Sequence, residues 1–289
     1  MNRVQIILRI LLGVTFLFSG YTKFVAPGFF EITLMDQGLA PSRFFAAQLA
    51  RLFIGLEFAL GILILFPFYT KQLMLISIVL LGSFTGHLIY LWAIGDSENC
   101  GCFGEMISMT PGESILKNLV LIAVSFFLHS KIPKDNRSLK IPVLIGLGFV
   151  LSMWAFLPIP NHRDFPFQSF THFESEGRVD LATGEKTVAV FNLDCEHCQE
   201  AAKKLGILYR KNLKFPKLYL LFYQEGSTTV SEFESLTQAS FPYAYMDVNM
   251  FFDLRGNSPP RIYYLREGKA EVIWDKDLVL KFQETFELK

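Results

Sequence analysis

The chain has 289 residues, of which 51% are hydrophobic, and it contains 30 Phe. This composition excludes one ordinary soluble domain, because the apolar residues are concentrated before about residue 160. The 27 basic and 27 acidic residues cancel, so nucleic acid is not an expected partner. These features predict a membrane domain at residues 1–160, a linker at 161–177 and a small soluble domain at 178–289.

Five apolar runs predict membrane-spanning helices. A helix needs roughly 17 to 25 mostly apolar residues to cross the hydrocarbon core. Runs at 4–21, 44–66 and 73–94 meet this length, and two shorter runs at 114–129 and 141–157 are either short spans or re-entrant segments. The first run is not followed by a signal-peptidase pattern, so it is not expected to be cleaved. We expect a four-helix core and a fifth span.

Loop charges predict the orientation of these spans. The loop after the fourth span is basic, whereas residues 95–113 contain four acidic and no basic residues. By the positive-inside rule, the basic loop is cytoplasmic and the acidic loop is outside. Lys23 and Arg43 fall in the expected outer first loop and count against this assignment. The prediction is a bacterial inner-membrane protein with a cytoplasmic N-terminus and a periplasmic C-terminal domain, so that all four cysteines lie outside.

The C-terminal part changes to a β-α-β pattern. The runs KTVAVFNL and KLYLLFY are short and strand-like, and EHCQEAAKKLGILYRK between them has helical spacing. A C-x-x-C pair at the start of such a helix indicates a redox motif rather than a zinc site. We expect a further helix near 231–238, a hairpin around 266–269 and a last helix near 276–286.

Residues 179–289 resemble the thioredoxin superfamily, which implies an α/β domain with a cis-proline facing the C-x-x-C pair. The matching proline is Pro259, although the adjacent Pro260 leaves open which bond is cis. Asp194 precedes the first cysteine where the family commonly has Trp, so the partner preference of thioredoxin is not carried over. The preceding aromatic linker, 161–177, is either mobile or lies on the membrane surface.

The C-x-x-C pair has residues that favour a thiolate. Cys195 stands at a helix N-terminus, where unpaired N–H groups and the helix dipole lower a thiol pKa. His197 adds to this effect when protonated, and the acidic neighbours of Cys195 oppose it. Cys198 is expected to be the buried, resolving thiol. A structural disulfide and half of a metal site remain alternatives.

The first part of the chain resembles the DoxX-like/MauE membrane family over residues 1–128. The resemblance is carried by FLFSGYTKFVAP, by Glu57, and above all by NCGCFG followed by Lys117 and Asn118. It implies disulfide chemistry on the outer side, in particular disulfide formation in a secreted partner. The resemblance implies that Cys100 and Cys102 are the redox pair of this domain.

A C-x-C disulfide closes a very small ring and is therefore readily reduced. As a structural disulfide it would constrain little chain entropy, which makes that alternative less attractive. Lys117 lies in the first turn of the fourth span, where it either favours the Cys102 thiolate or extends to the membrane interface.

Two ionisable residues fall deep within the spans. Ionisable groups inside a membrane are costly and are functional candidates by default. Glu57 has either a catalytic role or an ion pair that fixes helix packing. His87 is either a ligand for a quinone carbonyl or a hydrogen-bonded core histidine.

The positions of the cysteines restrict the mechanism. No cysteine lies within the spans or on the expected cytoplasmic side, so thiol exchange across the membrane is excluded. We expect a thiol-disulfide oxidoreductase that oxidises exported thiol proteins, passes electrons from C-x-x-C to C-x-C, and reduces a quinone. The alternatives are a reductase with reversed electron flow and a non-enzymatic metal-binding or assembly factor that uses the four cysteines. No resident metal is expected in the leading interpretation.

Overall fold

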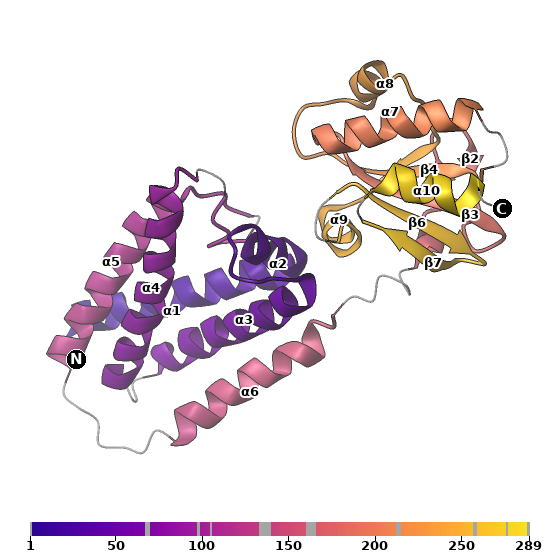
Figure 1. Ribbon diagram of the computed structural model, residues 1–289. Coiled ribbons are helices and arrows are strands. Elements are labelled where there is room, and N and C mark those ends of the chain that lie inside the picture. Colours follow the sequence, from indigo (N-terminus) through magenta and orange to yellow (C-terminus); the bar gives the residue numbers. More distant parts are fainter. Residues whose placement is uncertain are drawn as a thin grey trace. The chain divides into compact units, whose positions relative to one another are not determined.

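The computed structural model describes residues 2–66, 70–96, 99–104, 106–132, 140–159, 166–211, 215–256, 259–275 and 277–287. The chain divides into two compact units, Met1–Ile159 and Pro160–Lys289 (Figure 1). The first consists of helices and the second combines helices with a sheet.

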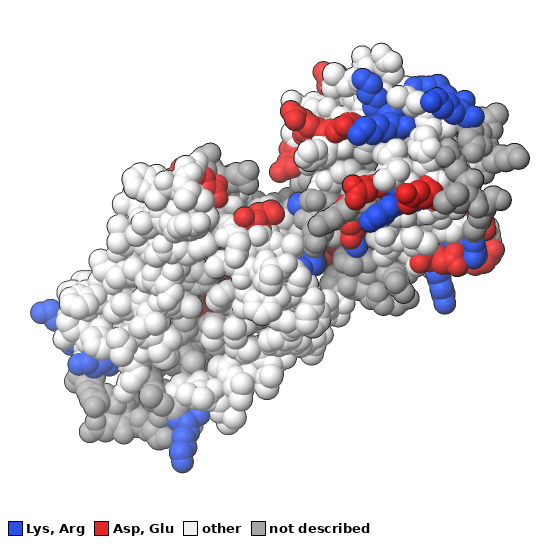
Figure 2. Space-filling model, viewed as in Figure 1, with Lys and Arg blue, Asp and Glu red and all other residues white. Residues whose placement is uncertain are grey.

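The first unit contains six described helices: α1 (Arg3–Val25), α2 (Pro27–Asp36), α3 (Arg43–Leu65), α4 (Thr70–Ala93), α5 (Pro111–Lys131) and α6 (Lys140–Phe156). Helices α1, α3, α4 and α5 are long and apolar enough to cross a membrane, and α6 is a shorter apolar helix. The visible face of this unit is largely uncharged, with Lys and Arg atoms at the end that contains the N-terminus and Asp and Glu atoms at the opposite end (Figure 2). The protein is a multi-pass membrane protein, as predicted.

Close helix packing builds the membrane unit. Helix α1 packs against α3, α4 against α5, and α6 against α3. A Cβ atom at Gly61 of α3 would lie 2.7 Å from the Leu17 side chain, and one at Gly55 would lie 2.6 Å from the Val150 Cα atom. These glycines let the helices approach closely, because little other than dispersion and hydrogen bonding joins helices in lipid.

Helix α2 was not predicted. It begins at Pro27, a residue suited to the first helical position. Its Glu31 is buried and forms ion pairs with Arg43 at 2.7 Å and Arg51 at 2.8 Å. Arg51 also donates to the Leu157 carbonyl at 2.7 Å and to the Pro158 carbonyl at 3.0 Å. The carboxyl end of α6 is therefore tied to the layer that contains α2.

The second unit is built on a five-stranded sheet in the order β5-β4-β3-β6-β7. Strands β3, β4 and β5 are parallel, and β6 and β7 are antiparallel to their neighbours. The strands are β3 (Glu185–Asn192), β4 (Leu218–Tyr223), β5 (Tyr243–Tyr245), β6 (Arg261–Arg266) and β7 (Lys269–Trp274). The helices are α7 (Glu196–Lys211), α8 (Val230–Thr237), α9 (Val248–Leu254) and α10 (Leu278–Glu287). This arrangement confirms the thioredoxin-like fold.

The helices cover both faces of this sheet. Buried side chains of α7, α8 and α10 share one apolar core with the sheet, and α7 and α10 run across the sheet in Figure 1. Helix α9, which the sequence analysis missed, packs on the opposite face, where Phe251 stacks on Tyr223 at 4.4 Å. The carbonyl of Leu254 in α9 also accepts a hydrogen bond from the Tyr263 hydroxyl at 2.5 Å.

The prediction of a linker at 161–177 is wrong for residues 166–177. This segment forms the short helix η2 (Phe167–Ser169), strand β1 (His172–Phe173) and the start of strand β2 (Gly177–Arg178). Phe167 and Phe173 are fully buried, with ring centroids 5.0 Å from Tyr263 and 4.9 Å from Tyr219, respectively. The aromatic residues cover the sheet rather than a membrane surface. Residues 161–165 lie outside the described part of the chain.

Candidate functional site

The C-x-x-C pair lies where strand β3 leads into helix α7. Cys195 is half-buried just before α7, and Cys198 is fully buried in its first turn. The Cys198 backbone N–H donates to the Cys195 sulfur at 3.3 Å, and the Asn192 N–H donates to the Cys198 sulfur at 3.5 Å. The helix N-terminus therefore stabilises negative charge on Cys195, as predicted.

The pKa values of the two thiols are shifted in opposite directions. A hydrogen bond from the Cys198 thiol, together with the backbone N–H groups of Cys198 and His197, lowers the pKa of Cys195 to about 6, although burial opposes this. Burial raises the pKa of Cys198. These acidities suit Cys195 as the attacking thiolate and Cys198 as the resolving thiol.

We expect the alkylation of Cys195 to depend on pH with a midpoint near 6. Because the thiolate is the nucleophile, its rate should be nearly constant above pH 7 and fall about tenfold per unit well below the midpoint. Iodoacetamide labelling of the reduced protein, followed by mass spectrometry of the two cysteine peptides, measures this directly. Faster labelling of Cys198 at pH 7 would contradict the assignment.

The surroundings of the C-x-x-C pair only partly match the expectations. The carboxylate of Asp194 accepts hydrogen bonds from the Gly226 N–H at 2.7 Å and the Thr228 N–H at 3.2 Å, so it holds the neighbouring loop. The peptide bond between Pro259 and Pro260 is cis, which makes Pro260 a cis-proline. The bond before Pro259, where the sequence comparison placed the cis-proline, involves a residue outside the described part. His197 is exposed and lines a shallow groove with both prolines.

The C-x-C loop is fixed against helices α1 and α2. Gly101 and Gly104 have φ values of +69° and +57°, which favour glycine. A Cβ atom at Gly101 would lie 2.8 Å from the Thr33 side chain, and one at Gly104 would lie 2.8 Å from the Thr22 carbonyl oxygen. The glycines of NCGCFG are therefore needed both for the turn and for the close contact.

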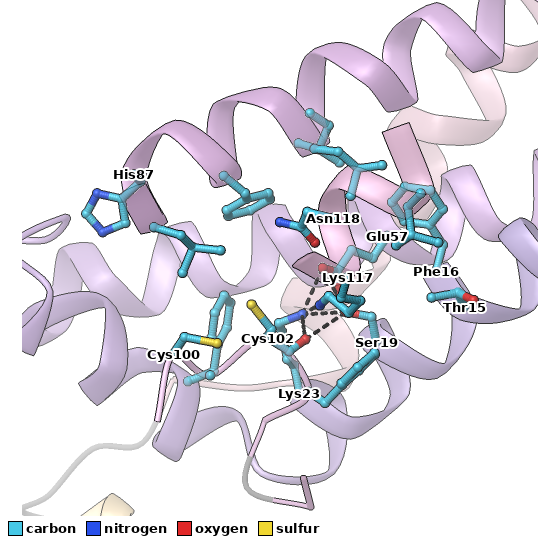
Figure 3. A pocket seen from close by; sticks show the side chains of 18 of the residues that line it. Thr15, Phe16, Ser19, Lys23, Glu57, His87, Cys100, Cys102, Lys117 and Asn118 are labelled. Atoms are coloured by element: carbon cyan, nitrogen blue, oxygen red, sulfur yellow. Dashed lines mark hydrogen bonds and ion pairs between the residues drawn. The ribbon is translucent and has the colours of Figure 1, made fainter. Parts of the chain in front are cut away.

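Lys23 anchors this loop. It lies in the last turn of α1 rather than in a loop, with 3% of its surface exposed, and forms an ion pair with Glu57 at 2.8 Å. Its ammonium also donates to the Cys102 carbonyl at 2.8 Å and to the Ser19 hydroxyl at 2.7 Å (Figure 3). The sequence analysis treated Lys23 as an outer loop charge and did not identify Ser19, although both lie within the quoted FLFSGYTKFVAP run. Glu57 therefore has the basic partner that the alternative of an ion pair fixing helix packing required.

The membrane cysteines also differ from each other. A hydrogen bond from the Cys100 thiol, with the positive charges of Lys117 and Lys23, lowers the pKa of Cys102 to about 5 against the effect of burial. The interaction with Cys102 and burial raise the pKa of Cys100, whose sulfur lies 2.9 Å from the Ser114 hydroxyl. Lys117 therefore lies close enough to favour the Cys102 thiolate, and its ammonium is 4.3 Å from the centroid of the Phe103 ring.

A single pocket brings together the functional candidates of the membrane unit. Phe and Leu side chains of α1, α2, α4 and α5 form the largest group in its lining. The candidates on its wall are Glu57, His87, Cys100, Cys102 and Lys117. They come from α3, α4, the C-x-C loop and α5, and Figure 3 shows them around the same space.

No group of three or more His, Cys, Asp or Glu side chains is arranged to hold a metal ion among the residues that the structure describes. The two cysteine pairs belong to separate units. The described residues of neither unit alone therefore form a metal site of this size.

Comparison with known proteins agrees with the resemblance of the membrane part. Residues 1–131 match the family model of methylamine utilisation protein MauE. The chain is also 29% identical to Protein TlpB of Flavobacterium psychrophilum over 325 aligned positions, which cover 91% of this chain and 89% of that protein. The chain thus joins a membrane domain that is similar to MauE to a thioredoxin-like domain.

Proposed function

We propose that this membrane thiol-disulfide oxidoreductase oxidises thiols of exported proteins and delivers the electrons to a membrane quinone. The convergence of both membrane cysteines, His87 and Glu57 on one apolar pocket is the observation that supports this proposal most strongly. A quinone ring is apolar and accepts two electrons, which is the number that a dithiol releases. The pocket has the chemical character that such a ring requires.

The first step of the relay is thiol-disulfide exchange between the two pairs. The Cys195 thiolate attacks the Cys100 sulfur, the bond between Cys100 and Cys102 breaks, and Cys102 leaves as a thiolate. Attack at Cys100 is favoured because a sulfur of low pKa is the better leaving group. Cys198 then attacks Cys195, which releases Cys100 and forms the Cys195–Cys198 disulfide.

The remaining two steps close the cycle. The Cys195–Cys198 disulfide oxidises two thiols of an exported protein and returns to the dithiol. The Cys100–Cys102 dithiol gives two electrons and two protons to the quinone, which becomes a quinol, and the membrane disulfide forms again. Atoms and electrons balance, and quinone is the final oxidant.

Mixed disulfides test the exchange between the pairs. In Cys198→Ser proteins that also carry Cys102→Ser or Cys100→Ser, Cys195 should form a cross-link with the remaining membrane cysteine under mild oxidation. We expect a cross-link in at least one of the two variants, because direct exchange requires Cys195 to reach the membrane pair. Peptide mass spectrometry after proteolysis quantifies both species. If neither forms, the two pairs do not exchange directly.

Accessibility of the cysteines tests the proposed orientation. The chain enters the second unit from the carboxyl end of α6, which Arg51 ties to α2. Gln37, which follows α2, donates to the Cys100 carbonyl at 3.2 Å, so the exit of the chain and the C-x-C loop lie on the same side of the bundle. In spheroplasts treated with a reductant, an impermeant maleimide should label Cys195 without lysis. Labelling only after lysis would place the C-terminal domain in the cytoplasm and exclude the proposal.

The direction of flow and the metal alternative require separate assays. Forward flow predicts that oxidised quinone converts the four thiols to two disulfides, measured by titration of free thiols. Reversed flow predicts that quinol generates free thiols instead.

Metal analysis of the same purified, reduced sample tests the binding of copper or zinc, and stoichiometric metal lost on oxidation would support the assembly-factor alternative.

A further inference from the structure

The polar side chains of the membrane pocket fall into two groups. Five have hydrogen-bond partners within the protein: Thr15, Ser19, Lys23, Gln37 and Glu57. Buried polar groups in native proteins are nearly always paired, so these five are explained by the fold. Any polar group in the pocket that is left without a protein partner requires a different explanation.

Three polar side chains form the second group, within the described residues. Lys117 lies against the Phe103 ring and close to Cys102, so its charge is accounted for. His87 has a buried Nε2 atom without a hydrogen-bond partner. The Asn118 side chain has 3% of its residue surface exposed, lines the pocket, and makes no hydrogen bond with the described protein.

An unpaired amide is costly in this environment. A buried polar group that loses its hydrogen bonds costs about 1–3 kcal/mol, and a leucine of similar shape at the same position would avoid that cost. Asn118 lies on α5 and His87 on the adjacent α4, and the other polar side chains of the lining are those already assigned partners or contacts. His87, Asn118 and both cysteines line the same pocket, and the His87 ring lies at one edge of it in Figure 3.

We infer that the Asn118 amide and the His87 imidazole hold the two carbonyl oxygens of a quinone in this pocket; this inference rests on the proposed function. Amide N–H and imidazole N–H groups both donate to carbonyl oxygens. Among the described residues neither group has a hydrogen-bond partner to give up, so both can donate to a ligand. The apolar side chains contact the ring, and Cys102 with Lys117 lies beside it as the source of electrons.

Binding can be measured apart from electron transfer. The background protein carries Cys100→Ser and Cys102→Ser, and the probe is decylubiquinone, whose fully substituted ring resists alkylation. Equilibrium dialysis in nanodiscs gives its Kd. Asn118→Leu keeps the volume of the side chain, and His87→Phe keeps a ring, while each removes the proposed donor. Ser125→Ala on α5 is the matched control, because this hydroxyl bonds to the Leu121 carbonyl and does not line the pocket.

We expect each of the two variants to raise the Kd by about tenfold, as for the loss of one hydrogen bond, and the control to change it less than twofold. Asn118→Leu should leave the melting temperature unchanged or raise it, because the amide has no protein partner to lose. Unchanged Kd values in both variants would overturn the inference. So would a lower melting temperature of Asn118→Leu, or failure of the background protein to bind the probe.

The same experiment separates this inference from the proposed function. If the intact protein binds decylubiquinone through Asn118 and His87 but transfers no electrons to it, the proposed relay is wrong and the binding site stands. If the intact protein reduces the quinone while both variants bind it normally, the relay stands and the inference fails.

Discussion

Replacing Cys102 with Ser is expected to reduce quinone reduction by the purified protein at least ~1000-fold, because the sulfur that donates the electrons is lost. Cys100→Ser should have the same effect, since neither residue alone can form the disulfide. The assay follows decylubiquinone absorbance with dithiothreitol as the reductant, because this small dithiol can reduce the membrane pair without the thioredoxin-like domain.

The Cys195→Ser/Cys198→Ser double variant is the control for this experiment. With dithiothreitol it should reduce quinone at close to the wild-type rate, but with a reduced unfolded protein as the electron donor it should be inactive. This split pattern distinguishes a relay of two pairs from two independent centres. Wild-type quinone reduction by a protein that lacks both Cys100 and Cys102 would contradict the mechanism.

The features predicted correctly from the sequence are those that depend on residues close together in the chain. Long apolar runs identified the four spans, because their length is set by the thickness of the bilayer. The change to short β-rich runs around a helical segment identified the thioredoxin-like unit, and the two cysteine motifs identified the pairs without any knowledge of packing. Helix α2 was missed because its 10 residues are too few to span a membrane and resemble a loop.

The errors concern contacts between residues far apart in the chain. Lys23 looked like an exposed loop charge, but its partner Glu57 is 34 residues away and no local pattern connects them. The aromatic residues at 166–173 were assigned to a linker that was either mobile or on the membrane surface, whereas Phe167 and Phe173 pack on strands that occur much later in the chain. An apolar side chain is equally suited to lipid and to a protein core, so only the fold distinguishes the two.

The pocket could be predicted only in part. His87 and Glu57 were candidates because ionisable groups are rare in spans. Their convergence on the C-x-C loop depends on the rotation of each helix about its axis, which the uniformly apolar runs do not specify. Asn118 was part of a recognised motif, but a hydrogen bond that is missing can be identified only when every neighbour of the amide is known.

Breaking the buried Lys23–Glu57 pair is expected to cost about 3–5 kcal/mol of stability, because either single change leaves an uncompensated charge in an apolar interior. Lys23→Met leaves the buried Glu57 carboxylate without its cation and also removes the donor to the Cys102 carbonyl. Glu57→Gln leaves the buried Lys23 ammonium without its anion. Thermal unfolding of the detergent-solubilised protein, followed by circular dichroism, measures the loss.

The double variant Lys23→Met/Glu57→Gln isolates the interaction between the two groups. With both charges removed, it should recover much of the lost stability, and a double-mutant cycle gives the coupling between them. Quinone reduction should stay low, because the Cys102 carbonyl still lacks the Lys23 donor that holds the loop over the pocket. Lys117→Met is the control, because this half-buried lysine has no carboxylate partner among the described residues and should affect the thiolate more than the fold. If the double variant recovers both stability and activity, Lys23 serves only to neutralise Glu57, and the position of Cys102 is set by the glycines of its own loop.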